Sequence, residues 1–179
     1  QELFLKIREN MHIRRFKRLE GILVPYVHGG GKIGVMVNLE TPAGATDAVL
    51  ACGKDCALQV AALKAPYLKR EDVPANVLES EKKIMLAQMD EDPKMANKPE
   101  QVKAKIVEGK IGKYYSENCL LDQEFVKDGS FTVQKYVDNC AKEANTTIKV
   151  VDYVCFERGE GVEKKEDNFA DEVASMMKK

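Results

Sequence analysis

The run Gly29-Gly30-Gly31-Lys32 contains the residue types of a phosphate-binding loop. A P-loop, however, needs Gly-Lys followed by Ser or Thr, because the hydroxyl binds magnesium and a helix must open behind the loop. Here Ile33 follows the lysine, and the next residues alternate between apolar and other side chains as a strand does. The glycines therefore predict the turn of a β-hairpin, with His28 at its tip, and not a nucleotide site.

Cysteine is the second residue type that could do chemistry. The sequence has an odd number of cysteines and no C-x-x-C pair; they are Cys52, Cys56, Cys119, Cys140 and Cys155. Cys52 and Cys56 stand one helical turn apart, where two thiolates could share a metal ion or one could act as a nucleophile. The alternative is that both are small core residues in a reducing cytosol. We favour this second interpretation and predict neither a metal nor a cofactor.

A catalytic set for acid–base or acyl-transfer chemistry is hard to assemble. The two histidines, His12 and His28, fall at the ends of predicted strands, and the sequence has no G-x-S-x-G motif. Carboxylates lie mostly in Lys- and Glu-rich stretches such as 79–83, which are typical of solvated helix faces. We therefore predict that the chain is not an enzyme and acts by binding.

The amino-acid composition limits the classes of binding partner and the cellular location that we expect for this protein. The chain has 179 residues, 44% of them hydrophobic and 32% charged, enough for one domain with a core and a small appendage. The formal net charge of −1 provides no excess of Lys and Arg for binding phosphates. No apolar run approaches the roughly 20 residues of a membrane span. We expect a cytoplasmic protein that binds neither nucleic acid nor membrane. Because it begins at Gln1, we also expect a processed product or a fragment.

Residues 1–71 are predicted to form a small core subdomain around the glycine turn. Residues 1–10 are typical of the end of a helix. Alternating apolar residues predict a strand over 32–39. The segments 22–28 and 12–19, the latter with Ile13, Phe16 and Leu19 among basic residues, also have extended character, so an antiparallel sheet of three strands is predicted. A helix is predicted over 45–64, where three- and four-residue spacing gives an apolar face of Val49, Cys52, Cys56, Val60 and Leu63. This helix should cover one face of the sheet and give a two-layer α+β fold.

Residues 72–121 are predicted to form an inserted antiparallel helical hairpin, a coiled coil. Two helical patterns flank a loop that contains two prolines, DPKMANKP. Each helix has one apolar stripe, which can be buried against the other; the stripes are Leu78, Met85 and Met89, then Ile106, Val107, Ile111, Tyr114 and Tyr115.

The chain is predicted to return to the core over residues 122–160. A short helix with Thr132 as its possible N-cap precedes a strand, in which Ile148, Val150, Val154 and Phe156 should share one face with Asp152 as the exception. Residues 161–179 are predicted to form a C-terminal helical module, capped by Asp167 or Asn168, with Phe169, Val173 and Met176 on one side. It would pack on the body or on a partner.

Several segments together resemble the second half of bacterial-type elongation factor Ts. In order, they are ENMHIRRFKRLEG, YVHGGGKIGVMV, KAPYLKREDV, VKAKIVEGKIGKYYSENCLLDQEFVKD and FERGEGVEKKEDNFADEV. The match covers nearly all of the chain, and the last two segments are the most specific. The resemblance implies the second part of the family's core, with its coiled-coil insertion and C-terminal module.

The resemblance implies a guanine-nucleotide exchange factor for elongation factor Tu, which acts in translation elongation by binding the nucleotide-free state. In the family, a T-D-F wedge in the first half of the core disturbs the nucleotide site. The Thr-Asp pair here, Thr46-Asp47, is followed by Ala48 and lies at an expected helix start. We therefore expect a fragment that holds the partner but lacks the wedge.

The resemblance also implies partner-binding residues. His28 with Gly29 matches a histidine at the hairpin tip that lies near the third domain of elongation factor Tu. Ile7 belongs to a K-I-G-E-N stretch near the partner, in which Arg8 replaces the glycine here. Val126 matches a position implicated in the same interaction, and it could equally be a core residue.

Two other functions remain as alternatives. The helical hairpin resembles a family insertion tied to dimer formation or to a second partner molecule, so the chain could be a dimerisation or scaffold module. A thiol-dependent enzyme that uses Cys52 or Cys56 is the third hypothesis.

Overall fold

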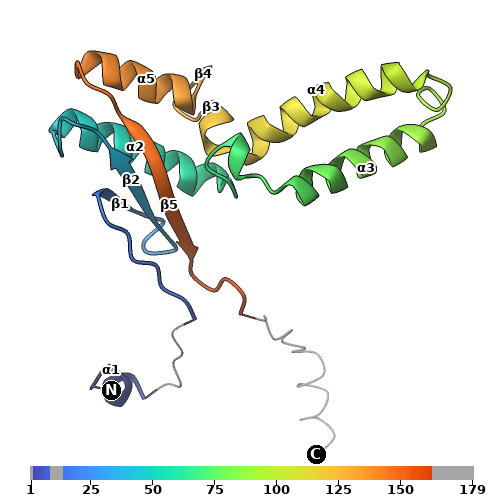
Figure 1. Ribbon diagram of the computed structural model, residues 1–179. Coiled ribbons are helices and arrows are strands. Elements are labelled where there is room, and N and C mark those ends of the chain that lie inside the picture. Colours follow the sequence, from blue (N-terminus) through green and yellow to red (C-terminus); the bar gives the residue numbers. More distant parts are fainter. Residues whose placement is uncertain (1, 9–13, 163–179) are drawn as a thin grey trace, which may run out of the picture.

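The computed structural model describes residues 2–8 and 14–162, and the predicted α+β class is confirmed. Its helices are α1 (Glu2–Ile7), α2 (Asp47–Leu63), α3 (Ala75–Glu91), α4 (Glu100–Asn118) and α5 (Val133–Glu143). Its strands are β1 (Ile22–His28), β2 (Ile33–Glu40), β3 (Glu124–Phe125), β4 (Asp128–Thr132) and β5 (Lys149–Glu157). Figure 1 shows α2 between the β1-β2-β5 sheet and α5, so α5 adds a layer to the sheet and helix that the sequence predicts.

The glycine run closes the β1–β2 hairpin, as its residue types predict. Gly29, Gly30 and Gly31 have φ angles of 59°, 63° and 89°, a backbone conformation that glycine adopts without steric cost. The Lys32 N–H donates to the His28 carbonyl at 3.1 Å. The two strands pair in register from Ile22 with Leu39 to His28 with Ile33.

The strand predicted over 12–19 is wrong for the described residues 14–19, which are neither helix nor strand. Basic side chains hold this segment against the sheet in place of backbone pairing. The Lys17 Nζ lies 2.6 Å from Asp152 of β5, and the Asn38 amide of β2 donates to the Glu20 carbonyl at 3.0 Å. The segment thus follows the outer face of the sheet without adding a strand.

Helix α2 packs unusually close to the sheet. Thr46 caps its start by accepting a hydrogen bond from the Val49 N–H at 3.4 Å, which gives the Thr46-Asp47 pair a structural role. A Cβ atom on Gly53 would lie 2.6 Å from Val24 and 2.8 Å from Leu39. The helix backbone therefore rests on the strands at a point where no larger residue fits.

The residues of β5 that face the core change from even-numbered to odd-numbered positions along the strand. The prediction that Ile148, Val150, Val154 and Phe156 share one face is therefore wrong. Val150 pairs with Leu39, but Asp152 pairs with Asn38, so Val151 is an extra residue in β5. After this β-bulge, Tyr153 and Cys155 face α2 and the core. Ile148 and Val150 are buried as predicted, whereas Val154 and Phe156 lie on the opposite face of the sheet.

The insertion is an antiparallel pair of helices that projects from the body (Figure 1). Its core is a separate cluster of Met89, Val107 and Ile111, with Leu78, Met85, Met95, Ile106 and Tyr115 packed around it. Both helices begin after a proline, at Pro74 and Pro99. Met and aromatic residues therefore form a packing seam between the helices, as the stripe predicts.

The return to the core contains the predicted helix and an additional hairpin. The Thr132 hydroxyl accepts from the Lys135 N–H at 3.3 Å and caps α5. A short β3–β4 hairpin, which the sequence patterns do not predict, precedes this helix. The C-terminal helix with Asp167 or Asn168 as its cap lies outside the described residues.

Replacing Gly53 by Ala is expected to lower the free energy of unfolding by about 1 kcal/mol. Alanine improves helix propensity by about 0.5–1 kcal/mol, but overpacking a core costs about 1–3 kcal/mol. Gly109→Ala in α4 is the matched control: no atom lies within 4 Å of its added Cβ, so it should be stabilising. Urea unfolding monitored by circular dichroism measures both, and a stabilising Gly53→Ala would contradict the close approach of α2 to the sheet.

Candidate partner-binding surface

His28 is presented at the end of β1 with its ring held by a neighbour. The side chain is exposed, and its Nδ1 lies 3.0 Å from the Tyr26 hydroxyl. The two ring centroids are 5.9 Å apart. When the hydroxyl donates to Nδ1, the proton of the neutral imidazole is on Nε2, which can then donate to another molecule. Val27 between them is 67% exposed, so the tip combines an apolar and a polar group.

Val126 lies in the two-residue turn between β3 and β4 and is 48% exposed. Its N–H donates to the Gln59 side chain of α2 at 2.7 Å. Beside it, the Phe125 ring stacks on Tyr136 of α5 with centroids 4.1 Å apart. The Tyr136 hydroxyl donates to the Asp55 carboxylate of α2 at 2.7 Å. Contacts to two helices therefore fix the position of this turn.

Ile7 and Arg8 lie at the end of α1, which Figure 1 shows apart from the sheet and its helices. Ile7 is 50% exposed, and Arg8 has a φ of 58°. That left-handed conformation favours glycine, the residue found at this place in the family motif. The structure does not bring these two residues beside His28. His28 and Val126 are also separate, because α2 lies between the sheet and the β3–β4 hairpin.

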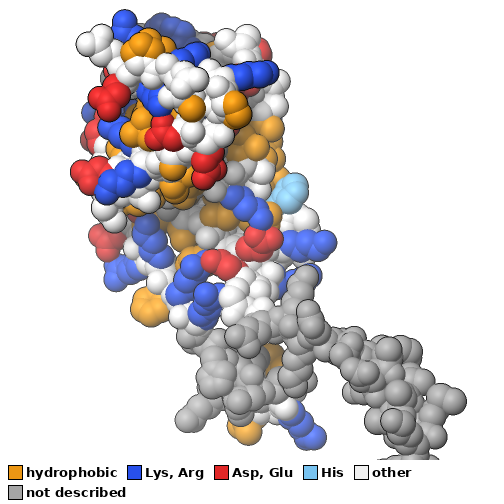
Figure 2. Space-filling model, turned by 90° about the vertical axis from the view of Figure 1, so that its right-hand side faces the viewer, with side chains coloured by type: hydrophobic (Ala, Val, Ile, Leu, Met, Phe, Trp, Pro, Cys, Tyr) orange, Lys and Arg blue, Asp and Glu red, His pale blue; other side chains and the backbone are white. Residues whose placement is uncertain are grey.

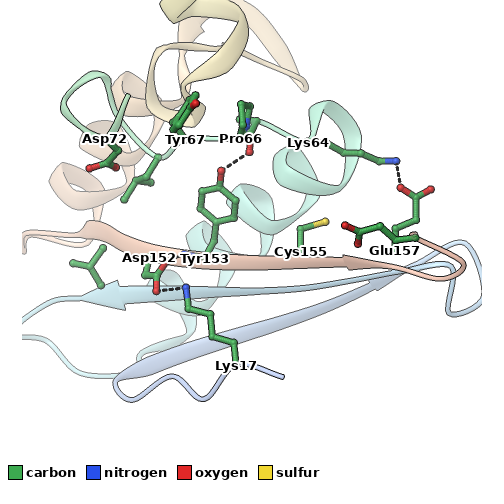
Figure 3. A pocket seen from close by; sticks show the side chains of 13 residues that line it. Lys17, Lys64, Pro66, Tyr67, Asp72, Asp152, Tyr153, Cys155 and Glu157 are labelled. Atoms are coloured by element: carbon green, nitrogen blue, oxygen red, sulfur yellow. Dashed lines mark hydrogen bonds and ion pairs between the residues drawn. The ribbon is translucent and has the colours of Figure 1, made fainter. Parts of the chain in front are cut away.

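A pocket of about 670 Å³ lies between β5 and the segment that follows α2 (Figure 3). The Tyr153 hydroxyl donates to the Ala65 carbonyl across it, and the Lys64–Glu157 ion pair closes one side. Burial raises the pKa of Tyr153 and of Cys155. Both side chains are therefore protonated at neutral pH, so neither provides an anionic nucleophile in this pocket.

Cys52 and Cys56 belong to the interior, which confirms their interpretation as core residues. Cys52, Cys56 and Cys119 are buried. A hydrogen bond with Cys56, together with burial, raises the pKa of Cys52. Burial raises the pKa of Cys119 and of Cys140, each to about 11. Residues 2–8 and 14–162 contain no group of three or more His, Cys, Asp and Glu side chains placed to hold a metal ion.

The charged surface does not indicate one class of charged ligand. On the face shown in Figure 2, Lys and Arg side chains are interspersed with Asp and Glu. Exposed basic residues often have an acidic partner, as Lys127 has in Asp55 at 2.5 Å. Among the described helices, none is long and apolar enough to cross a membrane. The surface is thus suited to contacts of shape and hydrogen bonding with another protein.

Comparison with known proteins identifies the family. Residues 1–160 match the family model described as Elongation factor TS. The chain belongs to the elongation factor Ts family. It is 42% identical over 178 residues to Elongation factor Ts of Clostridium kluyveri, and 44% identical over 180 residues to that of Clostridium botulinum. Elongation factor Ts of Clostridium tetani is 44% identical over 178 residues.

These matches cover 98% of the chain but only part of each relative. The chain spans 56% of the Clostridium kluyveri protein and 57% of the other two. The resemblance found in the sequence motifs is therefore confirmed as family membership over a part of the family's length.

Alkylation should separate the five thiols by burial. In the folded protein, iodoacetamide is expected to label Cys140 and Cys155, which are partly exposed, and to spare Cys52, Cys56 and Cys119. Because the pKa of Cys140 is about 11, its labelling rate should rise roughly tenfold per pH unit to that value, beyond the pH near 9 where an ordinary thiol levels off. Mass spectrometry of labelled peptides measures this, and all five should react in urea. Rapid labelling of Cys52 or Cys56 at neutral pH would contradict their core assignment.

Proposed function

We propose that this chain is the partner-gripping part of a guanine-nucleotide exchange factor for elongation factor Tu. The whole factor would promote GDP release during translation elongation by binding the nucleotide-free state of the GTPase. It would do so in the cytoplasm, without catalysing a chemical reaction and without contacting nucleic acid or a membrane. Family membership and the exposed, oriented imidazole of His28 support this proposal.

Contacts that hold elongation factor Tu and contacts that weaken its nucleotide binding differ in their effect on the free energy of nucleotide binding. An exchange factor accelerates release only if its contacts weaken nucleotide binding, by about 1.4 kcal/mol for each tenfold change. The sequence contains no T-D-F motif, and Thr46 and Asp47 begin α2. The described surfaces at His28 and Val126 lie on a rigid core and are suited to holding a partner. This chain alone should therefore bind elongation factor Tu and accelerate nucleotide release little.

Five residues are proposed as partner contacts: His28, Gly29, Val126, Ile7 and Arg8. His28 would donate from Nε2 to an acceptor on the third domain of elongation factor Tu, with Gly29 allowing close approach of the backbone. Val126 would place an apolar side chain against the partner. Ile7 and Arg8 would make a second contact at the end of α1.

A second candidate function is dimerisation through the helical hairpin. A groove of about 960 Å³ runs along α3 and α4 and includes Leu86, Ala104 and Gly112. Exposed Ile84 and Val102 add apolar surface to the same pair of helices. Analytical ultracentrifugation that shows a tight dimer with no affinity for the GTPase would favour this function over the first.

His28→Ala is expected to raise the dissociation constant for nucleotide-free elongation factor Tu about tenfold, because a contact at an interface centre contributes about 1–2 kcal/mol. The thermal unfolding midpoint should not change, since the side chain is exposed. Lys142→Ala, at an exposed position of α5, is the control and should bind as the unmodified chain does.

Stopped-flow release of labelled GDP tests the other half of the proposal. Adding the unmodified chain should change the rate of GDP release from elongation factor Tu only slightly. Acceleration close to that of a full-length family member would refute the division into gripping and wedging parts. Unchanged affinity of His28→Ala would remove His28 from the contact.

A further inference from the structure

Two buried amide side chains lie between α2 and the segment that carries Val126. Gln59 is 0% exposed and Gln123 is 2% exposed. A buried amide is destabilising unless its polar atoms are hydrogen-bonded, and an apolar side chain of similar volume avoids that cost. Packing alone therefore does not explain why glutamine occupies these two positions.

The two amides form a continuous chain of hydrogen bonds. Gln59 Nε2 donates to Gln123 Oε1 at 3.1 Å and to the Glu124 carbonyl at 3.0 Å. Gln59 Oε1 accepts from the Val126 N–H at 2.7 Å. Gln123 Nε2 donates to the Glu117 carbonyl in the last turn of α4 at 3.0 Å. This series of hydrogen bonds thus connects the helical hairpin, through α2, to the β3–β4 turn.

Besides the Gln59 bonds, the β3–β4 turn is held by the exposed ion pair of Lys127 with Asp55 of α2 at 2.5 Å and by the packing of Phe125. Strand β3 is two residues long, and its register with β4 shifts within those residues. The stacked Phe125 ring anchors the strand from one side, but stacking between flat rings permits sliding and rotation. Hydrogen bonds to both Glu124 and Val126 define the distance and direction of the turn from α2.

We propose that Gln59 is a positioning residue for Val126, and that Gln123 extends this role to the helical hairpin. Gln59 holds the Val126 turn at the height above α2 at which its side chain meets the protein partner. Gln123 orients the Gln59 amide and connects it to the end of α4. The inference rests on the proposed function insofar as Val126 is a partner contact.

Hydrogen exchange of the Val126 amide tests the positioning without any partner. Gln59→Met preserves length and approximate volume but removes the acceptor, so exchange at Val126 should accelerate at least about tenfold. Amides of β2 should be unchanged. Gln134→Met is the matched control, because Gln134 is exposed on α5 and bonds to Asp138 at 2.8 Å. Unchanged Val126 exchange in folded Gln59→Met would overturn the proposal.

Gln123→Met provides a second variant if Gln59→Met does not fold. It leaves the Gln59 bonds to the turn possible but removes the acceptor that orients the amide. Exchange at Val126 should then accelerate about threefold or more. No change in this variant would also overturn the proposal.

A double-mutant cycle tests the effect on binding to elongation factor Tu. Gln59→Met and Val126→Ala should each weaken affinity about fivefold, and the double variant should be no weaker than Val126→Ala alone. Additive losses would show that Gln59 does not act through Val126, against the proposal. A purely structural role for Gln59 would lower stability without this non-additivity.

The same cycle separates this inference from the proposed function. If Val126→Ala binds normally, the placement of Val126 in the contact is overturned. If His28→Ala still weakens binding in that case, the proposed function stands. If neither substitution affects binding, the proposed function fails, whereas the exchange experiment still decides whether Gln59 positions the turn.

Discussion

The close approach of α2 to the β1–β2 hairpin is the constraint on which the rest of the structure depends. It requires a glycine at position 53, where any side chain would collide with Val24 and Leu39. With the helix so near, the buried residues on both of its sides join one continuous core. Leu39 of the sheet and Val137 of α5 are then buried on opposite sides of a single helix.

This arrangement explains how His28, at the end of β1, and Val126, in a turn, are both attached to the packed core. The His28 tip extends from strands packed under α2, and the Val126 turn is bonded to α2 from the other side. A neighbouring side chain bonds to each candidate contact: Tyr26 to the imidazole of His28, and Gln59 to the backbone of Val126. Pre-ordered contacts of this kind lose little conformational entropy on binding. The raised pKa values of Cys52, Cys119, Cys140 and Cys155 keep these thiols protonated at neutral pH.

Sequence patterns predict the elements whose periodicity is long and whose boundaries carry turn or cap residues. The glycine hairpin, the α2 helix with Thr46 at its start and the helical hairpin belong to this group. Sequence patterns give the wrong structure where contacts between distant residues determine the backbone conformation. Residues 14–19 have the extended character of a strand but are held on the sheet by the Lys17–Asp152 ion pair without strand pairing. One extra residue at Val151 reverses the faces of β5.

The partner surface is less predictable than the fold, for physical reasons. The motif resemblance indicates His28 and Val126, but nothing in their local sequence shows that α2 separates them. Gln59 sits within an apolar helix face, and its role appears only when Gln123 and the β3–β4 turn lie beside it. The turn at Val126-Lys127 lacks the Gly, Asn or Asp residues that mark tight hairpins, so its sequence does not predict a turn.

Calorimetric titration of the chain into elongation factor Tu, once nucleotide-free and once saturated with GDP, tests the central claim most directly. We expect a saturable 1:1 heat in both titrations with affinities within about tenfold of each other, because a chain that holds the GTPase without disturbing its nucleotide site has little coupling to nucleotide. Absence of binding heat in both titrations would contradict it.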